Sequence, residues 1–169
     1  MQKQTIAFLF LILSAVSTVN AQLGDRDVDI RFGVGTSKFK GESDYLFLTE
    51  YELNAKLSDY FTVAPSILLN HTDNIDIESA DFFQANLNAF GSPSRNDRRN
   101  DFRMGGGLSF YRLNKGGNSA TRSALGLNFV LENTYMINDF FLIGIKVFMQ
   151  PYFNKDINYG TFLKIGINL

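Results

Sequence analysis

The residues best able to do chemistry in this sequence are charged side chains that recur at alternate positions within apolar stretches. Asp29 and Arg31 are two residues apart, and so are Glu50 and Glu52. Charges that leave bulk water together must pair, because a buried charge without a partner is very costly. The set holds four acidic and five basic side chains: Asp29, Glu50, Glu52, Glu132, Arg31, Lys56, Arg103, Lys146 and Lys164. This near balance predicts a paired network shielded from bulk water.

His71 is the sole histidine and the natural starting point for a catalytic site. Serine hydrolases that act on lipids place a histidine beside a serine and a polar or acidic partner. Ser66 is five residues upstream along a strand-like stretch, roughly 16 Å away and on the opposite face. Ser79 or Glu78 could complete a triad from the following loop, but no spacing specifies it. We therefore expect His71 to be a plain loop residue and expect no catalytic residues.

Three other groups carry weaker signals. Asp73, Asp76 and Glu78 offer oxygen ligands that suit Ca²⁺, but they lack the glycine and the distal glutamate of an EF-hand loop. The glycines at 105–107 are followed by strand alternation instead of a helix, so they predict curvature or close packing and no phosphate site. The basic residues within 95–99 suit a solvated turn, with contact to a partner protein as the alternative. No metal or cofactor is expected.

The elements that carry these residues are strands, because polar and apolar side chains alternate along most of the chain. In the last eleven residues, Thr161, Leu163, Ile165 and Ile167 form an apolar row, whereas Lys164 belongs to a polar, glycine-containing row. A period of two is that of a β-strand, whose successive side chains leave opposite faces. The same pattern predicts strands at 27–40, 45–57, 60–69, 81–90, 101–112, 123–135, 140–153 and 159–169.

The first 21 residues are expected to be a secretory signal peptide. Lys3 precedes an apolar run over 6–16, and the small residue Ala21 marks the expected cleavage site. The run is about half the ~20 residues of a spanning helix. Residues 22–169 then form one domain with 15 basic and 17 acidic residues, since removal of Lys3 lowers the basic count from 16. Such balance does not favour a nucleic-acid partner, and the absence of cysteine excludes a disulfide framework.

Strand length, turn pattern and aromatic placement favour a closed barrel in a membrane. Strands of about ten residues cross a bilayer at a tilt, and an apolar strand at the very end of the chain can pair with the first strand. Two aromatic girdles are expected at the strand ends: one of Tyr60, Phe61, Tyr135, Phe140 and Phe141, the other of Phe39, Tyr45, Phe82, Phe110, Tyr152 and Phe153. Pro65 predicts a β-bulge, and the registers near Pro65 and Pro151 stay open. A soluble lipocalin-like barrel is the competing prediction, but its interior would be apolar.

The signal sequence, the eight alternating strands and the apolar final strand resemble the small outer-membrane β-barrel proteins of Gram-negative bacteria, of the OmpX-like and OmpA-barrel-like group. The final Leu169 departs from the aromatic residue, often Phe, with which such barrels usually end. The resemblance implies an exported protein integral to the outer membrane. Its expected fold is all-β, an eight-stranded antiparallel up-and-down transmembrane β-barrel with both termini in the periplasm.

In such a barrel the alternating charges point into the lumen. We expect a lumen charge network of Asp29, Arg31, Glu50, Glu52, Arg103, Glu132, Lys146 and Lys164. An eight-stranded barrel leaves little more room than side chains fill, so this network predicts a plug, with a proton or ion path as the alternative. The favoured function is a non-enzymatic structural or interaction barrel in contact with outer-membrane lipid, its periplasmic or extracellular protein partner left open. The alternative is a small channel or a membrane-embedded lipid hydrolase.

Overall fold

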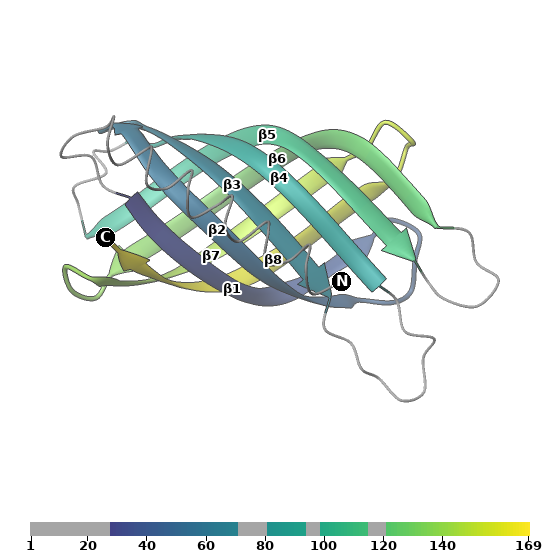
Figure 1. Ribbon diagram of the computed structural model, residues 1–169, viewed down its shortest axis with the longest axis horizontal. Helices are drawn as coiled ribbons and strands as arrows, with labels where there is room; N and C mark the ends of the chain where they lie inside the picture. The colour runs from purple at the N-terminus through teal and green to yellow at the C-terminus, as the bar shows by residue number, and fades with distance from the viewer. Residues whose placement is uncertain (1–27, 71–80, 94–98, 115–120) are drawn as a thin grey trace, which may run out of the picture.

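The computed structural model describes residues 28–70, 81–93, 99–114 and 121–169, which form a closed barrel of eight strands (Figure 1). The strands are β1 (Val28–Phe39), β2 (Leu46–Ser58), β3 (Phe61–Asn70), β4 (Asp81–Gly91), β5 (Asn100–Asn114), β6 (Arg122–Met136), β7 (Phe141–Pro151) and β8 (Ile157–Asn168). Each pairs antiparallel with its sequence neighbours, so the predicted up-and-down barrel is confirmed. The expected strand bounds agree with these to within two residues.

The barrel closes between the first and the last strand. β1 pairs with β8 over eleven positions, from Asp29↔Asn168 to Phe39↔Asn158. Closure leaves no strand edge exposed along this seam, as the apolar final strand predicted. No helix in the described residues is long and apolar enough to cross a membrane.

The two rims of the barrel differ in their connections. The start of β1 and the end of β8 lie at the same end, which we call the terminal rim (Figure 1). Residues 59–60 and 137–140 connect strands there. The opposite end, the loop rim, carries the connections 40–45 and 152–156, and β3 and β5 end at it. The expected signal peptide, residues 1–21, lies outside the described residues.

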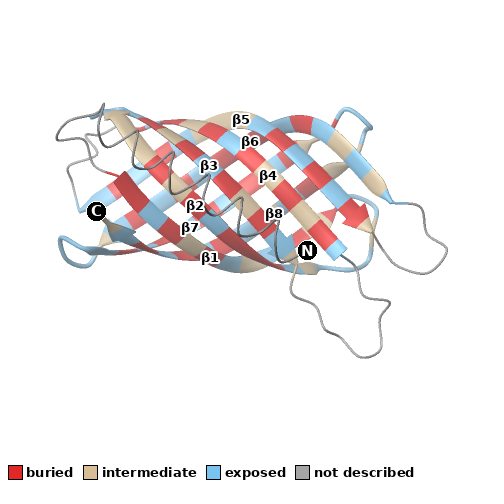
Figure 2. Cartoon of the chain, viewed as in Figure 1, coloured by how far each residue is buried: buried red, intermediate tan, exposed pale blue. Residues whose placement is uncertain are grey.

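Apolar side chains cover the outside of the barrel and polar ones line the inside. Along β7, outward side chains with exposures between 44 % and 55 % alternate with buried inward ones, which gives the checkered pattern of Figure 2. The outward residues of β7 are Phe141, Ile143, Ile145, Val147 and Met149, and the inward ones include Lys146 and Gln150. A soluble lipocalin-like barrel would show the reverse. This arrangement is favourable only when the surrounding solvent is lipid.

Inward glycines lie opposite inward aromatic rings on neighbouring strands. Gly105 pairs with Phe90, and Gly160 pairs with Phe148. A β-carbon on Gly105 would lie 2.5 Å from the Phe90 ring and 2.6 Å from the carbonyl oxygen of Ala89. The ring therefore occupies the space that a side chain at 105 would need, which confirms the close packing expected for the glycines at 105–107.

The bulge expected at Pro65 is wrong. β3 and β4 stay in register through Pro65↔Leu87, and the β2–β3 register is the same on both sides of Pro65. The irregularity lies instead between Lys56 and Ser58, beside the tight turn to β3. Pro65 lacks only an amide donor, so the β-ladder keeps its register past it. The register shifts only beside the turn, where the chain reverses. At Pro151 the ladder reaches Pro151↔Ile157 without a shift.

The aromatic girdle predicted near the loop rim is wrong for three of its members. Phe39, Phe82 and Tyr152 are buried inside the barrel, with exposed fractions of 2 %, 1 % and 4 %. Their positions continue the inward alternation of their strands. Their rings therefore fill the lumen beyond the last polar side chains, toward the loop rim. The other residues expected at the two girdles are all exposed: Tyr60, Phe61, Tyr135, Phe140, Phe141, Tyr45, Phe110 and Phe153.

Candidate functional site

Six of the eight strands direct charged side chains into the lumen, where they meet. β1 and β2 each provide two, and β5, β6, β7 and β8 provide one each. Strand alternation aims them inward, and barrel closure brings residues from distant parts of the chain together. The exposed fraction is 4 % or less for every member: Asp29, Arg31, Glu50, Glu52, Arg103, Glu132, Lys146 and Lys164. The half-buried Lys56 lies on β2, nearer the terminal rim than the other charged residues of that strand.

Arg31 binds two carboxylates on different strands. Its Nε donates to Asp29 Oδ1 at 2.6 Å and its Nη2 donates to Asp29 Oδ2 at 2.8 Å, which makes a two-pronged ion pair. Its Nη1 donates to Glu132 on β6 across the lumen. Because the guanidinium is planar with fixed donors, this double contact fixes the position of the side chain as well as neutralising it.

Arg103 connects the two carboxylates at the centre of the network. Its Nη2 donates to Glu52 Oε1 and to Glu132 Oε1, each at 2.9 Å. The guanidinium carbon lies 4.1 Å from the centre of the Phe90 ring, the same ring that covers Gly105. The aromatic face adds a favourable contact for a cation that is away from water.

The two lysines complete the neutralisation of the glutamates. Lys146 Nζ donates to Glu50 Oε1 at 2.6 Å and to Glu52 Oε2 at 2.7 Å. Lys164 Nζ lies 2.8 Å from Glu52 Oε2, and 3.4 Å from both Glu50 Oε2 and Glu132 Oε2. Each glutamate therefore faces at least two cations.

The eight side chains carry four negative and four positive charges, so their net charge is zero. Such a set is stable away from bulk water only when every member has an opposite charge within contact distance, as each has here. The network links strands far apart in sequence, and its charged groups bind mainly to one another. Chemically it is an ion-paired cross-brace of the lumen. Ser66 pairs with Glu52 between β2 and β3, and its hydroxyl oxygen accepts from Asn86 Nδ2 at 3.1 Å.

A second polar layer and an aromatic layer, both missed by the sequence analysis, fill the lumen between the charges and the loop rim. Tyr152 Oη lies 3.0 Å from Gln150 Oε1 and 3.2 Å from Gln84 Oε1, either of which can accept its one hydrogen, and Gln84 Nε2 donates to Asn86 Oδ1 at 2.9 Å. Above them, the ring centres of Tyr111 and Tyr152 are 4.4 Å apart. Other apolar members of this layer are Phe39, Leu48, Leu68, Phe82 and Leu113. The inward parity of their strands was the signal that could have identified them.

At the loop rim, Arg122 connects two loops above the aromatic layer. Its Nη2 donates to Glu42 Oε1 at 2.5 Å, and its Nη1 lies 3.7 Å from Asp156 Oδ1. Tyr111 donates its hydroxyl hydrogen to Asp156, and Asn154 Nδ2 donates to the Tyr111 hydroxyl oxygen at 2.9 Å. These contacts hold the β1–β2 and β7–β8 connections together over the mouth of the barrel.

Several residues considered from the sequence lie outside the described residues: His71, Asp73, Asp76, Glu78, Ser79, Arg95 and Arg98. Within the described ranges, no group of three or more histidine, cysteine or acidic side chains could hold a metal ion.

The fold and the lumen define the class of molecule as a membrane-spanning, eight-stranded antiparallel β-barrel. Solved structures with this fold include Ail, the attachment invasion locus protein of Yersinia pestis, in complex with the heparin analogue sucrose octasulfate. It matches with a TM-score of 0.66 at 13 % identity, over 86 % of this chain and 100 % of Ail.

Two structures from Pseudomonas aeruginosa are also similar. The N-terminal β-barrel domain of OprF gives a TM-score of 0.65 at 14 % identity, over 83 % of this chain and 97 % of that domain. The outer membrane protein OprG gives 0.61 at 13 % identity, over 85 % and 96 %. At this identity the likeness shows the fold, and it agrees with the resemblance to small outer-membrane barrels seen in the sequence. No protein-family model and no curated protein sequence matches the chain.

Proposed function

We propose that this protein is an integral outer-membrane β-barrel with a non-enzymatic structural or interaction role and a lumen closed by its own side chains. The observation that carries the proposal is the lumen charge network, four carboxylates and four cations buried in mutual contact. An ion pathway needs charged groups that face water, whereas these groups face one another.

Two further features support a closed lumen. An eight-stranded barrel has an interior that side chains fill, without the aqueous channel of larger barrels. Between the charges and the loop rim, the amide layer and the rings of Tyr111 and Tyr152 occupy the same narrow space. An ion would have to displace both layers to cross.

The loop rim suits an interaction role. Arg122 joins the β1–β2 and β7–β8 connections through Glu42 and Asp156, so these two loops are held together at the loop rim. With residues 1–21 removed on export and the terminal rim in the periplasm, these loops face the outside of the cell. A structural role and an interaction role then use opposite parts of the molecule, the barrel wall and the loops.

Single-channel recording in a planar lipid bilayer tests the closed lumen. The wild-type protein should show no steady conductance at any voltage that the membrane tolerates. Glu132→Gln alters the network, and Glu42→Gln at the loop rim is the matched control. Stable, reproducible current steps from the wild type, with an ion selectivity that Glu132→Gln changes and Glu42→Gln does not, would overturn the plug in favour of a channel.

A further inference from the structure

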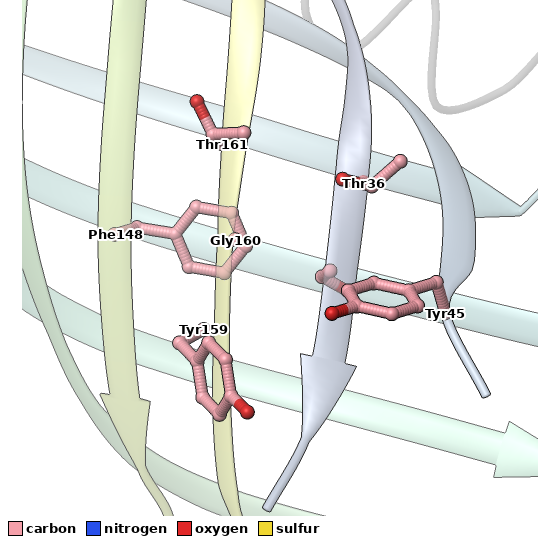
Figure 3. Close-up of a pocket in the computed structure, with 7 residues that line it drawn as sticks. Thr36, Tyr45, Phe148, Tyr159, Gly160 and Thr161 are labelled. Atoms are coloured by element: carbon pink, nitrogen blue, oxygen red, sulfur yellow. The ribbon is translucent and has the colours of Figure 1, made fainter. Parts of the chain in front are cut away.

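A shallow hollow of about 290 Å³ lies on the outer face of the barrel, over the seam between β1 and β8 (Figure 3). Its walls include Thr36 and Thr161, which pair across the seam, and Tyr159, which pairs with Lys38 one step nearer the loop rim. Tyr45, in the connection that precedes β2, also lines the hollow. Toward the loop rim, the next outward residue of β1 after Thr36 is Lys38.

The floor of the hollow includes Gly160, an inward position of β8. Gly160 pairs with Ser37 at this point of the seam, and the Phe148 ring lies against Gly160 from the inside. A β-carbon at 160 would lie 2.3 Å from the carbonyl oxygen of Thr36 and 2.8 Å from the Phe148 ring. Gly160 therefore admits the Phe148 ring on the inner side, and the outer face carries only backbone here, between the outward side chains of Tyr159 and Thr161.

Several polar side-chain groups around the hollow have no hydrogen-bond or ion-pair partner among the described residues. The Lys38 ammonium lies 4.8 Å from the centre of the Tyr45 ring. In the part of the chain that the structure describes, neither the Lys38 ammonium nor the hydroxyls of Thr36, Tyr45 and Tyr159 form an ion pair or a hydrogen bond. Figure 3 shows the ring of Tyr159 on β8 and the ring of Tyr45, which comes from the connection before β2 and lies over the end of β1. By contrast, the Thr161 hydroxyl donates to the backbone oxygen of Lys146 at 3.1 Å.

An apolar stripe continues directly from the hollow toward the middle of the barrel. Below the Thr36↔Thr161 pair, the seam carries Val34↔Leu163, then Phe32↔Ile165, then Ile30↔Ile167. Leu163 and Ile165 are each 60 % exposed. A cation with hydroxyl donors at one end of an exposed apolar stripe matches the two ends of a membrane lipid, an anionic head and an acyl chain.

We propose that this hollow binds the phosphate-bearing head of a membrane lipid, whose acyl chain lies along the β1–β8 stripe. Lys38 supplies the positive charge, and the hydroxyls of Tyr45, Tyr159 and Thr36 donate to the phosphate oxygens. Charge-assisted hydrogen bonds are stronger than neutral ones, and the lipid interface lowers the competition from water. The inference rests on the proposed membrane location, and it adds a lipid class and a site to it.

Native mass spectrometry of the detergent-solubilised barrel tests the site with three probes. These are short-chain phosphatidic acid, the matching diacylglycerol that lacks the phosphate, and inorganic phosphate. The wild type should bind phosphatidic acid at least about tenfold more tightly than either of the others, because only that lipid satisfies both ends of the site. Equal binding of diacylglycerol, or of inorganic phosphate alone, would overturn the proposal.

Matched variants locate the binding. Lys38→Gln removes the positive charge and should weaken phosphatidic acid binding about tenfold. Tyr159→Phe removes one hydroxyl donor and should weaken it severalfold. The controls are Arg112→Gln, an outward cation on β5, and Tyr135→Phe, an outward tyrosine toward the terminal rim. Losses as large in the controls as in the seam variants would contradict a site at β1–β8.

Gel mobility before and after heating separates this inference from the proposed function. A chain that shows no heat-dependent shift in detergent contradicts the membrane barrel itself. A barrel that shifts on heating but has no preference for the phosphate-bearing lipid contradicts only the seam site.

Discussion

At the residue scale, the protein depends on how its lumen charges share partners. Glu132 contacts Arg31, Arg103 and Lys164, which come from three different strands. Its carboxylate is almost entirely shielded from solvent. Removing that one charge leaves cations on three strands with less compensation, so the consequence should exceed the loss of a single contact.

Glu132→Gln should therefore lower the free energy of unfolding in detergent by ~3–5 kcal/mol, the cost typical of breaking a buried pair. Chemical denaturation followed by circular dichroism measures this. Glu42→Gln is the control, because its ion pair with Arg122 is partly exposed and should contribute about 1 kcal/mol or less. Adding Arg103→Gln to Glu132→Gln restores neutrality, so the double variant should lose less than the two single losses combined. Strict additivity would show that the two side chains do not share a network.

The glycine–aromatic pairs give a second test at the level of single residues. Gly105→Ala places a methyl group against Phe90 and the Ala89 carbonyl, and should destabilise the barrel by about 1–3 kcal/mol through overpacking. Gly91→Ala, where a β-carbon meets nothing within 4 Å, should change the stability little. The comparison uses the same denaturation measurement, and a similar loss in both variants would exclude close packing as the reason.

At the element scale, alternation determines which way each side chain faces, and this facing could be predicted from the sequence. Strand bounds, antiparallel order and the inward direction of Arg31, Glu52 and Lys164 all follow from a period of two and from short connections. Facing also has a direct mutational test on β8, where neighbouring residues alternate between lipid and lumen.

Ile165→Arg should destabilise the barrel by ~2–4 kcal/mol or block its insertion, because it puts a charge on the lipid face. Ile165 is 60 % exposed and pairs with Phe32 and Ile143. Asn168→Arg, on the inward row near the terminal rim, should be milder. The yield of heat-shifting barrel after refolding into vesicles measures both variants, and equal effects would mean that the facing of β8 is wrong.

Partner choice inside the lumen could not be predicted from the sequence. Arg31 contacts Glu132, which is 101 residues away, and this depends on the tilt and stagger of a closed barrel. Three aromatic residues, Phe39, Phe82 and Tyr152, were predicted wrongly for a different reason. The preference of aromatic side chains for membrane interfaces was given more weight than parity, although parity alone places Phe39 and Phe82 inside.

At the scale of the whole molecule, the barrel is built for two solvents at once. Its outer face offers lipid a surface of side chains such as Leu163 and Ile145, which are 60 % and 55 % exposed. Its interior holds charges, amides and rings in successive layers, each partnered mainly within itself. Both features follow from one rule of alternation applied around a closed sheet, and both require that a membrane surrounds the barrel.

The distribution of the native chain between cell fractions tests this account most directly. Cells that express the full-length protein are separated into a soluble periplasmic fraction, an inner-membrane fraction and an outer-membrane fraction, and the chain is detected on gels with and without heating. We expect it in the outer membrane, extractable only with detergent, with a mobility that changes on heating as the closed barrel unfolds. Recovery from the periplasm as a monomer that stays soluble without detergent would contradict the account.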